Sequence, residues 1–299
     1  MPSPTLPRRA LGSTGIEVSI LGLGTVKLGR NEGVKYPDTF AIPDDRSAQA
    51  LLTLARDRGI NLIDTAPAYG TSEQRLGKLL QGQREHWVIC SKVGEEFTEG
   101  ESHYHFDPAH TRSSIERSLQ RLNTEVLDIV LVHSDGNDDA IINDYGTLQV
   151  LGEMKQEGKI RSFGMSTKTV SGGLLAAEQC DVVMVTWNLA YNDEIPVIDR
   201  CLELNKGVLI KKALASGHIN PNQSGSGQIN SGQSGSSQSG SSQSDKSVND
   251  KLANDSPGDP VASTFKTLLG HQGVSSIIIG SINPEHIRSN IDAAIAVSP

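Results

Sequence analysis

The sequence predicts an α/β protein, a closed (β/α)8 barrel (TIM barrel) with a short N-terminal hairpin. Short runs rich in Val, Ile and Leu alternate with longer amphipathic stretches to the end of the chain, which is typical of parallel strands joined by helices. Eight strand–helix pairs are expected, as in a closed barrel, whereas an open doubly wound sheet more often has about five or six strands. The chain has 299 residues. Without one low-complexity stretch, that length approaches the ~250 residues typical of one barrel.

The expected elements follow one another in a regular order after a hairpin around residues 9–20. Strands are expected at 21–24, 60–64, 87–92, 128–133, 162–165, 181–186, 207–211 and 275–280. Helices are expected near 44–58, 72–81, 109–122, 145–158, 168–177, 194–206, 261–270 and 284–296. Several begin with a capping side chain followed by proline or an acidic residue. These starts are Asp44-Asp45, Ser72-Glu73, Asp107-Pro108 and Asn283-Pro284-Glu285.

A low-complexity insert, residues 222–259, interrupts this order. From Asn222 to Ser244 it consists almost wholly of Ser, Gly and Gln, which keep the backbone free and offer nothing to bury. We expect a disordered insert within a single barrel domain that spans residues 1–299. It lies between the seventh strand and helix 261–270, on the face of the barrel that carries function. A tolerated insertion and a mobile cover over the ligand both stay open as interpretations.

Composition argues against several classes of protein. Lys and Arg number 27 against 35 Asp and Glu, a net charge of −8, and the basic residues are scattered, so we expect no nucleic-acid partner. No apolar run approaches the ~18 residues of a membrane span, and the start lacks a signal-like apolar segment. We therefore expect a soluble, cytoplasmic protein. No metal site is expected, and the cysteines are too few and too widely spaced for disulfides. We expect buried thiols at Cys90, Cys180 and Cys201.

Ionisable side chains stand at the ends of three successive strands, which converge on one mouth of a barrel. Asp64, Lys92 and His133 end the strands, and Tyr69 follows Asp64 in the next loop. Singly, each has a plain structural explanation. Together, Lys92 would lower the pKa of the Tyr69 phenol, and Asp64 would keep Lys92 charged. A neutral His133 would donate a hydrogen bond to the substrate oxygen. This set suits delivery of a proton to a carbonyl oxygen while hydride reaches its carbon.

The stretch Asp64-Thr-Ala-Pro-Ala-Tyr69-Gly resembles the signature of the aldo-keto reductase family, and the likeness extends over the chain outside the insert. The resemblance implies an NAD(P)H-dependent oxidoreductase that acts on a small-molecule aldehyde, ketone or sugar-like substrate. It implies a nicotinamide cofactor bound in extended form over the barrel mouth, without a Rossmann domain. It also implies a catalytic tetrad in which the tyrosine is the general acid in reduction and the general base in alcohol oxidation. The tetrad is Asp64, Tyr69, Lys92 and His133.

The same resemblance implies residues that hold the nicotinamide half of the cofactor. Ser166 and Thr167 occupy the place of the pair that binds the carboxamide, where Ser166 matches the family and Thr167 departs from it. Trp187 occupies the place of the aromatic ring that stacks on the nicotinamide. Met184 replaces the usual glutamine, and Lys211, at the end of the seventh strand, completes this part of the expected site.

The last strand and helix are similar to the family's site for the adenosine phosphate. A helix start with short polar side chains suits an anion. His286 stands where many relatives have arginine, and Gly280 where some have lysine. On this basis NADP(H) is favoured, and NAD(H) stays possible. The expected residues are Gly280, Ser281, Asn283, His286 and Asn290.

Two other functions stay open. One is a nicotinamide-binding regulatory or redox-sensing subunit with little turnover, since some relatives of the family act as channel subunits. The other is an aldolase-like barrel that uses Lys92 for a Schiff base, which leaves Tyr69 and His133 without roles. The substrate, the physiological direction and the oligomeric state do not follow from the sequence. The pocket is expected to be built by loops near 25–37, 95–107, 134–144 and the insert.

Overall fold

The structure is a computed structural model that describes residues 4–34, 36, 39–215 and 259–298. Apart from Asp259, the expected insert 222–259 lies outside the described residues, so its disorder stays a prediction.

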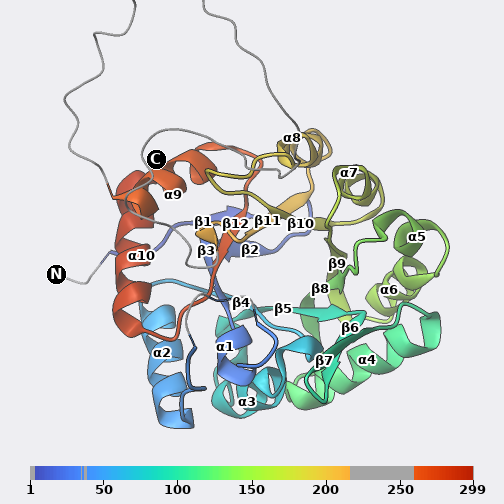
Figure 1. The fold of residues 1–299 in the computed structure, drawn as a ribbon, viewed down its shortest axis with the longest axis horizontal. Coiled ribbons are helices and arrows are strands. Elements are labelled where there is room, and N and C mark those ends of the chain that lie inside the picture. Colours follow the sequence, from blue (N-terminus) through green and yellow to red (C-terminus); the bar gives the residue numbers. More distant parts are fainter. Residues whose placement is uncertain (1–3, 35, 37–38, 216–258, 299) are drawn as a thin grey trace, which may run out of the picture.

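Eight parallel strands close into a barrel in the order β10-β11-β12-β3-β4-β5-β8-β9 (Figure 1). Each strand pairs with its neighbours along the chain, and the last pairs with the first. The antiparallel hairpin of β1 (Arg8–Ala10) and β2 (Glu17–Ser19) precedes them. The predicted fold class is therefore confirmed. The barrel strands are β3 (Leu21–Gly24), β4 (Leu62–Asp64), β5 (Val88–Val93), β8 (Leu127–His133), β9 (Ile160–Ser166), β10 (Val182–Thr186), β11 (Gly207–Lys211) and β12 (Ser276–Ile279).

Helices form a ring outside the barrel (Figure 1). The longer ones are α2 (Asp45–Asp57), α3 (Ser72–Leu79), α4 (Pro108–Arg121), α6 (Thr147–Gln156), α7 (Val170–Gln179), α8 (Ile195–Glu203), α9 (Pro260–Gly270) and α10 (Pro284–Val297). The short ones are α1 (Val26–Gly29), η1 (Pro67–Tyr69), η2 (Arg84–His86) and α5 (Asp138–Asn143).

Most of the predicted helix starts carry the expected cap. Asp107 accepts a hydrogen bond from the backbone N–H of His110, and Asn283 accepts one from that of Glu285. The start expected at Ser72 is different, because this side chain is buried and donates to Thr25 Oγ1 at 2.8 Å. Ser72 thus joins α3 to the end of β3 instead of capping the helix.

Two apolar layers follow from the alternation of side chains along each strand. Leu62 faces the barrel interior and packs with residues of the N-terminal hairpin, whereas its neighbour Ile63 belongs to the layer between strands and helices. The three cysteines are buried free thiols, as predicted.

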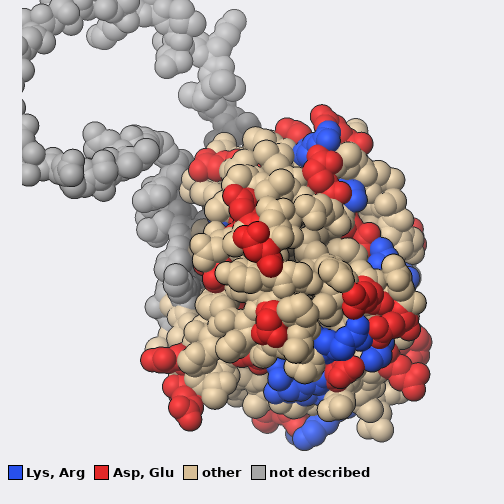
Figure 2. Space-filling model, turned by 90° about the vertical axis from the view of Figure 1, so that its right-hand side faces the viewer, with Lys and Arg blue, Asp and Glu red and all other residues tan. Residues whose placement is uncertain are grey.

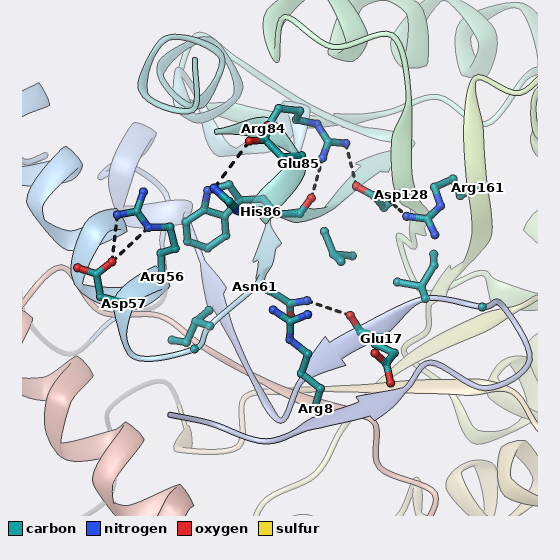
Figure 3. A pocket seen from close by; sticks show the side chains of 16 residues that line it. Arg8, Glu17, Arg56, Asp57, Asn61, Arg84, Glu85, His86, Asp128 and Arg161 are labelled. Carbon is teal, nitrogen blue, oxygen red and sulfur yellow. Dashed lines mark hydrogen bonds and ion pairs between the residues drawn. The ribbon is translucent and has the colours of Figure 1, made fainter. Parts of the chain in front are cut away.

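A polar network closes the amino-terminal end of the barrel, around a cavity of about 730 Å³ (Figure 3). Arg84 and Arg161 both donate to the buried carboxylate of Asp128, at 2.8 and 2.7 Å. Asn61 donates to the carbonyl oxygen of Glu17 at 2.9 Å and so ties the hairpin to β4. Both arginines already share Asp128 as their acidic partner, so we assign this end a structural role.

One hairpin was not expected from the sequence. β6 (Glu95–Thr98) and β7 (Glu101–Tyr104) pair antiparallel after β5. Glu99 and Gly100 connect them with positive φ angles of 53° and 84°, as a two-residue hairpin turn requires. Three of the eight strand residues are Glu, which has low β propensity, so the composition of this segment did not indicate strands.

Side chains of both charge signs lie next to one another on the face that is at the right in Figure 1 (Figure 2). Arg112 of α4 reaches Glu153 at 3.2 Å and Glu157 at 2.9 Å, which links α4 to α6 and the turn after it. No described helix has both the length and the hydropathy needed to cross a membrane.

Candidate active site

A cavity of about 670 Å³ opens at the carboxyl ends of the barrel strands. Parallel strands of a barrel present their last side chains at this end, where barrel enzymes have their active sites. The structure brings the predicted tetrad together here. The lining includes Asp64, Tyr69, Lys92 and His133.

Asp64 and Lys92 form a buried ion pair at the base of the cavity. The Lys92 ammonium donates to Asp64 Oδ1 and, at 3.0 Å, to the carbonyl oxygen of Thr65. The two residues are only 4% and 2% exposed. Burial disfavours the charge of Lys92, but Asp64 outweighs burial, and the net effect raises the pKa of Lys92. Lys92 therefore stays charged, as predicted.

Tyr69 ends η1, the single turn that follows β4. Its Oη donates to Asp64 Oδ2 at 3.3 Å, and the Lys92 ammonium lies 4.8 Å from its ring centroid. Burial and the charge of Asp64 raise the pKa of Tyr69, and the opposing effect of Lys92 does not cancel them. The lowering expected from Lys92 is thus present but outweighed. The phenol keeps its proton at neutral pH.

A close approach of backbone to backbone positions Tyr69. An added methyl group at Gly29, the last residue of α1, would collide with the carbonyl oxygen of Tyr69 and the N–H of Ser72. Glycine at this position therefore lets α1 pack directly against the turn that carries the phenol.

His133 ends β8 and lies beside Tyr69, with ring centroids 6.4 Å apart and ring planes at 88°. Its Nδ1 is 2.7 Å from Oε2 of Glu95, the first residue of β6. Burial lowers the pKa of His133, and the charges of Lys92 and Lys211 act in the same direction, while Glu95 opposes them incompletely. The imidazole is therefore neutral at neutral pH.

Seven of the ten predicted cofactor-binding residues line the same cavity. They are Ser166, Met184, Lys211, Gly280, Ser281, His286 and Asn290.

The other three point elsewhere. Trp187 is buried and packs edge-on against His271, with centroids 5.7 Å apart. Thr167 is fully buried, and Asn283 caps α10. The structure does not bring these side chains to the cavity.

Lys211 joins two neighbouring parts of the predicted nicotinamide site. Its ammonium donates to Ser166 Oγ at 2.9 Å and to the carbonyl oxygen of Thr167 at 2.7 Å. Burial lowers the pKa of Lys211 to about 8, although Glu194 acts in the opposite direction. The end of β11 is thereby tied to the end of β9.

Other lining residues escaped the sequence reasoning, notably Lys27, Tyr36 and Lys212. Lys27 follows the first barrel strand, and its ammonium lies 4.1 Å from the ring centroid of Tyr36. Lys27 and Tyr36 lie in the loop near 25–37 that was expected to form the pocket, whereas Lys212 lies outside every loop expected there. Nothing in the sequence distinguished Glu95 as a site residue, because it stands among several other glutamates.

The charge of the lining fits an anionic ligand. The whole chain carries a net charge of −8. Among the described lining residues, however, Asp64 is the only carboxylate, and it is paired with Lys92. The basic members are Lys27, Lys92, Lys211, Lys212, His133 and His286. Phosphate groups of a nicotinamide dinucleotide suit this donor set. Within the described ranges, no three His, Cys, Asp or Glu side chains are grouped so as to hold a metal ion.

Comparisons with known proteins agree with this site. A model described as the aldo/keto reductase family matches residues 20–298. A solved structure assigned as an aldo-keto reductase from Pseudomonas aeruginosa is 48% identical, with a TM-score of 0.80, over 99% of this chain and 98% of that one. The uncharacterized oxidoreductase YqkF of Bacillus subtilis is 26% identical over 97% of this chain and 91% of its own length.

The aldo-keto reductase YhdN of Bacillus subtilis is 33% identical over a shorter stretch, 54% of this chain and 47% of its own length. The family match covers nearly the whole barrel and includes every residue of the tetrad. The chain therefore belongs to the aldo/keto reductase family, whose members are enzymes that carry out the NAD(P)H-dependent oxidoreduction of carbonyl compounds.

Proposed function

We propose that this enzyme transfers hydride between NADP(H) and the carbonyl or alcohol group of a small molecule, with Tyr69 as the general acid and base. The observation that carries the proposal is the shared cavity. A protonated phenol, a buried ammonium and an imidazole converge there beside a basic lining.

Tyr69 holds the proton that a reduced carbonyl oxygen needs. The bound cofactor would supply or accept the hydride. As the proton leaves Tyr69, the Lys92 ammonium, 4.8 Å from the ring centroid, stabilises the phenolate. Asp64 keeps that ammonium charged in a buried setting. In alcohol oxidation, the phenolate takes the proton back.

The cofactor would lie along the cavity from the tetrad to α10. Ser166 and Lys211 are proposed for the nicotinamide half. Met184 is proposed for contact with the ring in place of Trp187, because only Met184 lines the cavity. The adenosine half is assigned to Gly280, Ser281, His286 and Asn290. The basic lining supports NADP(H) over NAD(H) because the former carries an additional phosphate.

The cofactor proposal is tested by fluorescence titration of the purified protein with NADPH and with NADH, followed by calorimetry. We expect saturable binding of both, with NADPH tighter. A folded sample that bound neither would remove the hydride-transfer mechanism. Tight binding without turnover of any aldehyde, ketone or sugar would fit a redox-sensing subunit instead.

The role of Tyr69 is tested by Tyr69→Phe. We expect a fall in kcat of about 10²–10⁴-fold, the usual contribution of a positioned acid–base group, with the Kd for NADPH nearly unchanged. Tyr145→Phe is the matched control, because Tyr145 is 46% exposed and does not line the cavity. Normal turnover by Tyr69→Phe would refute the assignment.

A further inference from the structure

Glu95 is a buried carboxylate that the tetrad mechanism does not use. It is 8% exposed and lies on the β6–β7 hairpin, which packs beside the turn that carries Tyr69. Its Oε2 is 2.7 Å from His133 Nδ1, and its Oε1 accepts a hydrogen bond from Ser102 Oγ at 2.6 Å. Arg30 lies 3.8 Å from the same Oε1.

Arg30 connects this carboxylate to the catalytic turn. Its guanidinium donates to the carbonyl oxygen of Ala68, next to Tyr69, at 3.0 Å, and it stacks 3.5 Å over the ring of Phe97 on β6. Glu95 is thus held in a fixed place between the arginine and His133.

The carboxylate stays ionised at every pH at which the protein would be assayed. Burial opposes its charge, but the contacts with His133 and Ser102 and the charge of Arg30 outweigh burial and lower the pKa of Glu95 to about 2. An ionised carboxylate only accepts hydrogen bonds, so the proton of the neutral imidazole belongs on Nδ1.

The two nitrogens of His133 have different surroundings. Nδ1 is buried 2.7 Å from Glu95 Oε2, although the ring is not turned for a well-aligned hydrogen bond, so the negative charge of the carboxylate is what favours a proton on Nδ1. The side chain as a whole is 23% exposed and lines the cavity, so the opposite edge of the ring, which bears Nε2, reaches the cavity.

We propose that Glu95 is a positioning residue that keeps His133 protonated on Nδ1, so that Nε2 changes from acceptor to donor when the imidazole becomes charged. The proposal rests on the proposed function and refines the role of His133 in it. With this tautomer, a neutral His133 would not donate to a carbonyl oxygen from Nε2, so the proposal differs from the expectation stated from the sequence, and the NMR measurement below distinguishes the two.

The charge of His133 then distinguishes the two directions of the reaction. A charged imidazole donates from Nε2 to a carbonyl oxygen and assists reduction. A neutral one accepts the O–H of an alcohol and assists oxidation. As pH rises through the pKa of His133, kcat/KM for reduction therefore falls and that for oxidation rises.

Other titratable and charged groups surround Glu95 and His133. In the pH range in which His133 titrates, they either keep their charge or shift the pKa of His133 in a direction that follows from their charge. Lys92 of β5 and Lys211 of β11 both disfavour the imidazolium. Tyr69 faces the ring as a neutral phenol. Burial, together with the charge of Glu95, raises the pKa of the Tyr104 phenol on β7. Arg30 stays cationic.

The first test is NMR of the full-length protein labelled with ¹⁵N-histidine, which identifies the protonated ring nitrogen directly. The His133 signal is assigned by its loss in His133→Gln. We expect neutral His133 to carry its proton on Nδ1. A proton on Nε2 would overturn the proposal, and this measurement needs neither a substrate nor a Glu95 variant that folds.

The second test is Glu95→Gln, which removes the charge with little change of shape. We expect the pKa of His133 to fall by about 1–3 units, the effect of losing an opposite charge at this distance. The pH at which kcat/KM for reduction declines should fall with it. Glu95→Asp keeps the charge and should restore part of the shift.

Glu96→Gln is the matched control. Glu96 is the next residue on β6 but pairs with Arg117 and accepts from Ser114 at 3.1 Å, toward α4. It should leave the titration of His133 unchanged. An unchanged titration in a folded Glu95→Gln protein would refute the role of Glu95. Absence of turnover in every variant would instead refute the proposed function and leave the NMR result standing.

Discussion

The ammonium of Lys92 and the carboxylate of Asp64 each depend on the other, because neither has water to replace its partner. Removal of one partner leaves an uncompensated buried charge, which costs about 3–5 kcal/mol of unfolding free energy. The pKa of Lys92 is raised in the folded state. The contribution of the ion pair to the free energy of unfolding is therefore fully present at pH values below the usual lysine pKa. It is lost only as pH rises through the pKa that Lys92 has in the folded protein.

We expect Lys92→Met to lower the free energy of unfolding by about 3–5 kcal/mol at pH 7, measured by urea denaturation. The double variant Asp64→Asn/Lys92→Met should recover much of this loss, because it removes both charges. Lys266→Met, at an exposed position of α9, should stay within about 0.5 kcal/mol of the parent protein. Equal losses in the single and double variants would show that packing, not charge, explains the cost.

Residue spacing is also consistent with Met184 lining the cavity while Trp187 does not. Side chains alternate along a strand, so positions 184 and 187 point to opposite faces if the strand continues. β10 ends at Thr186, and Met184 is the residue that lines the cavity. The family pattern identified the strand, but the face depends on where the strand ends.

At the scale of elements, α1 and η1 touch through Gly29, and this contact fixes the height of the phenol in the cavity. We expect Gly29→Ala to displace η1, to cost about 1–3 kcal/mol of stability, as overpacking does, and to lower kcat. Gly152→Ala is the control, because a methyl group on that residue of α6 meets nothing within 4 Å. It should stabilise the protein by up to about 1 kcal/mol. Unchanged kcat in Gly29→Ala would show that the contact does not position Tyr69.

The elements that could be predicted were those with strong local patterns. Apolar runs in the sequence predicted the barrel strands. The positions of ionisable side chains at the ends of those strands indicated the tetrad. The β6–β7 hairpin has neither signal, since its segment is polar and its turn depends on Glu99 and Gly100. The contact between Glu95 and His133 is absent from the local sequence, because it forms only when β5 pairs with β8 and so brings the start of β6 beside the end of β8.

Across the molecule as a whole, the two ends of the barrel have different roles, since one carries a structural polar network and the other the proposed active site. Asp128 at the amino-terminal end accepts from Arg84, from Arg161 and from the backbone N–H of Ile89 at 2.9 Å. The tetrad lies at the opposite end of the same strands.

We expect Asp128→Ala to cost about 1–3 kcal/mol of stability, because the buried N–H of Ile89 and the partly exposed guanidinium groups of two arginines lose their shared acceptor. Thermal denaturation measures the loss. Below the unfolding temperature, kcat/KM should change by less than about twofold, since no transition-state contact is removed. A large fall in kcat/KM in a folded sample would contradict this separation of stability from activity.

The contrast between an acidic chain and a lysine-rich cavity has a consequence for how a phosphorylated ligand arrives. At distances beyond the ~8 Å Debye length of physiological salt, solvent ions screen the repulsion from the net charge of −8. Closer in, the lysines of the lining dominate the local field. In dilute buffer, the net negative charge of the protein repels an approaching anionic ligand, and moderate salt screens this repulsion. We therefore expect the association rate of the ligand to be highest at an intermediate ionic strength.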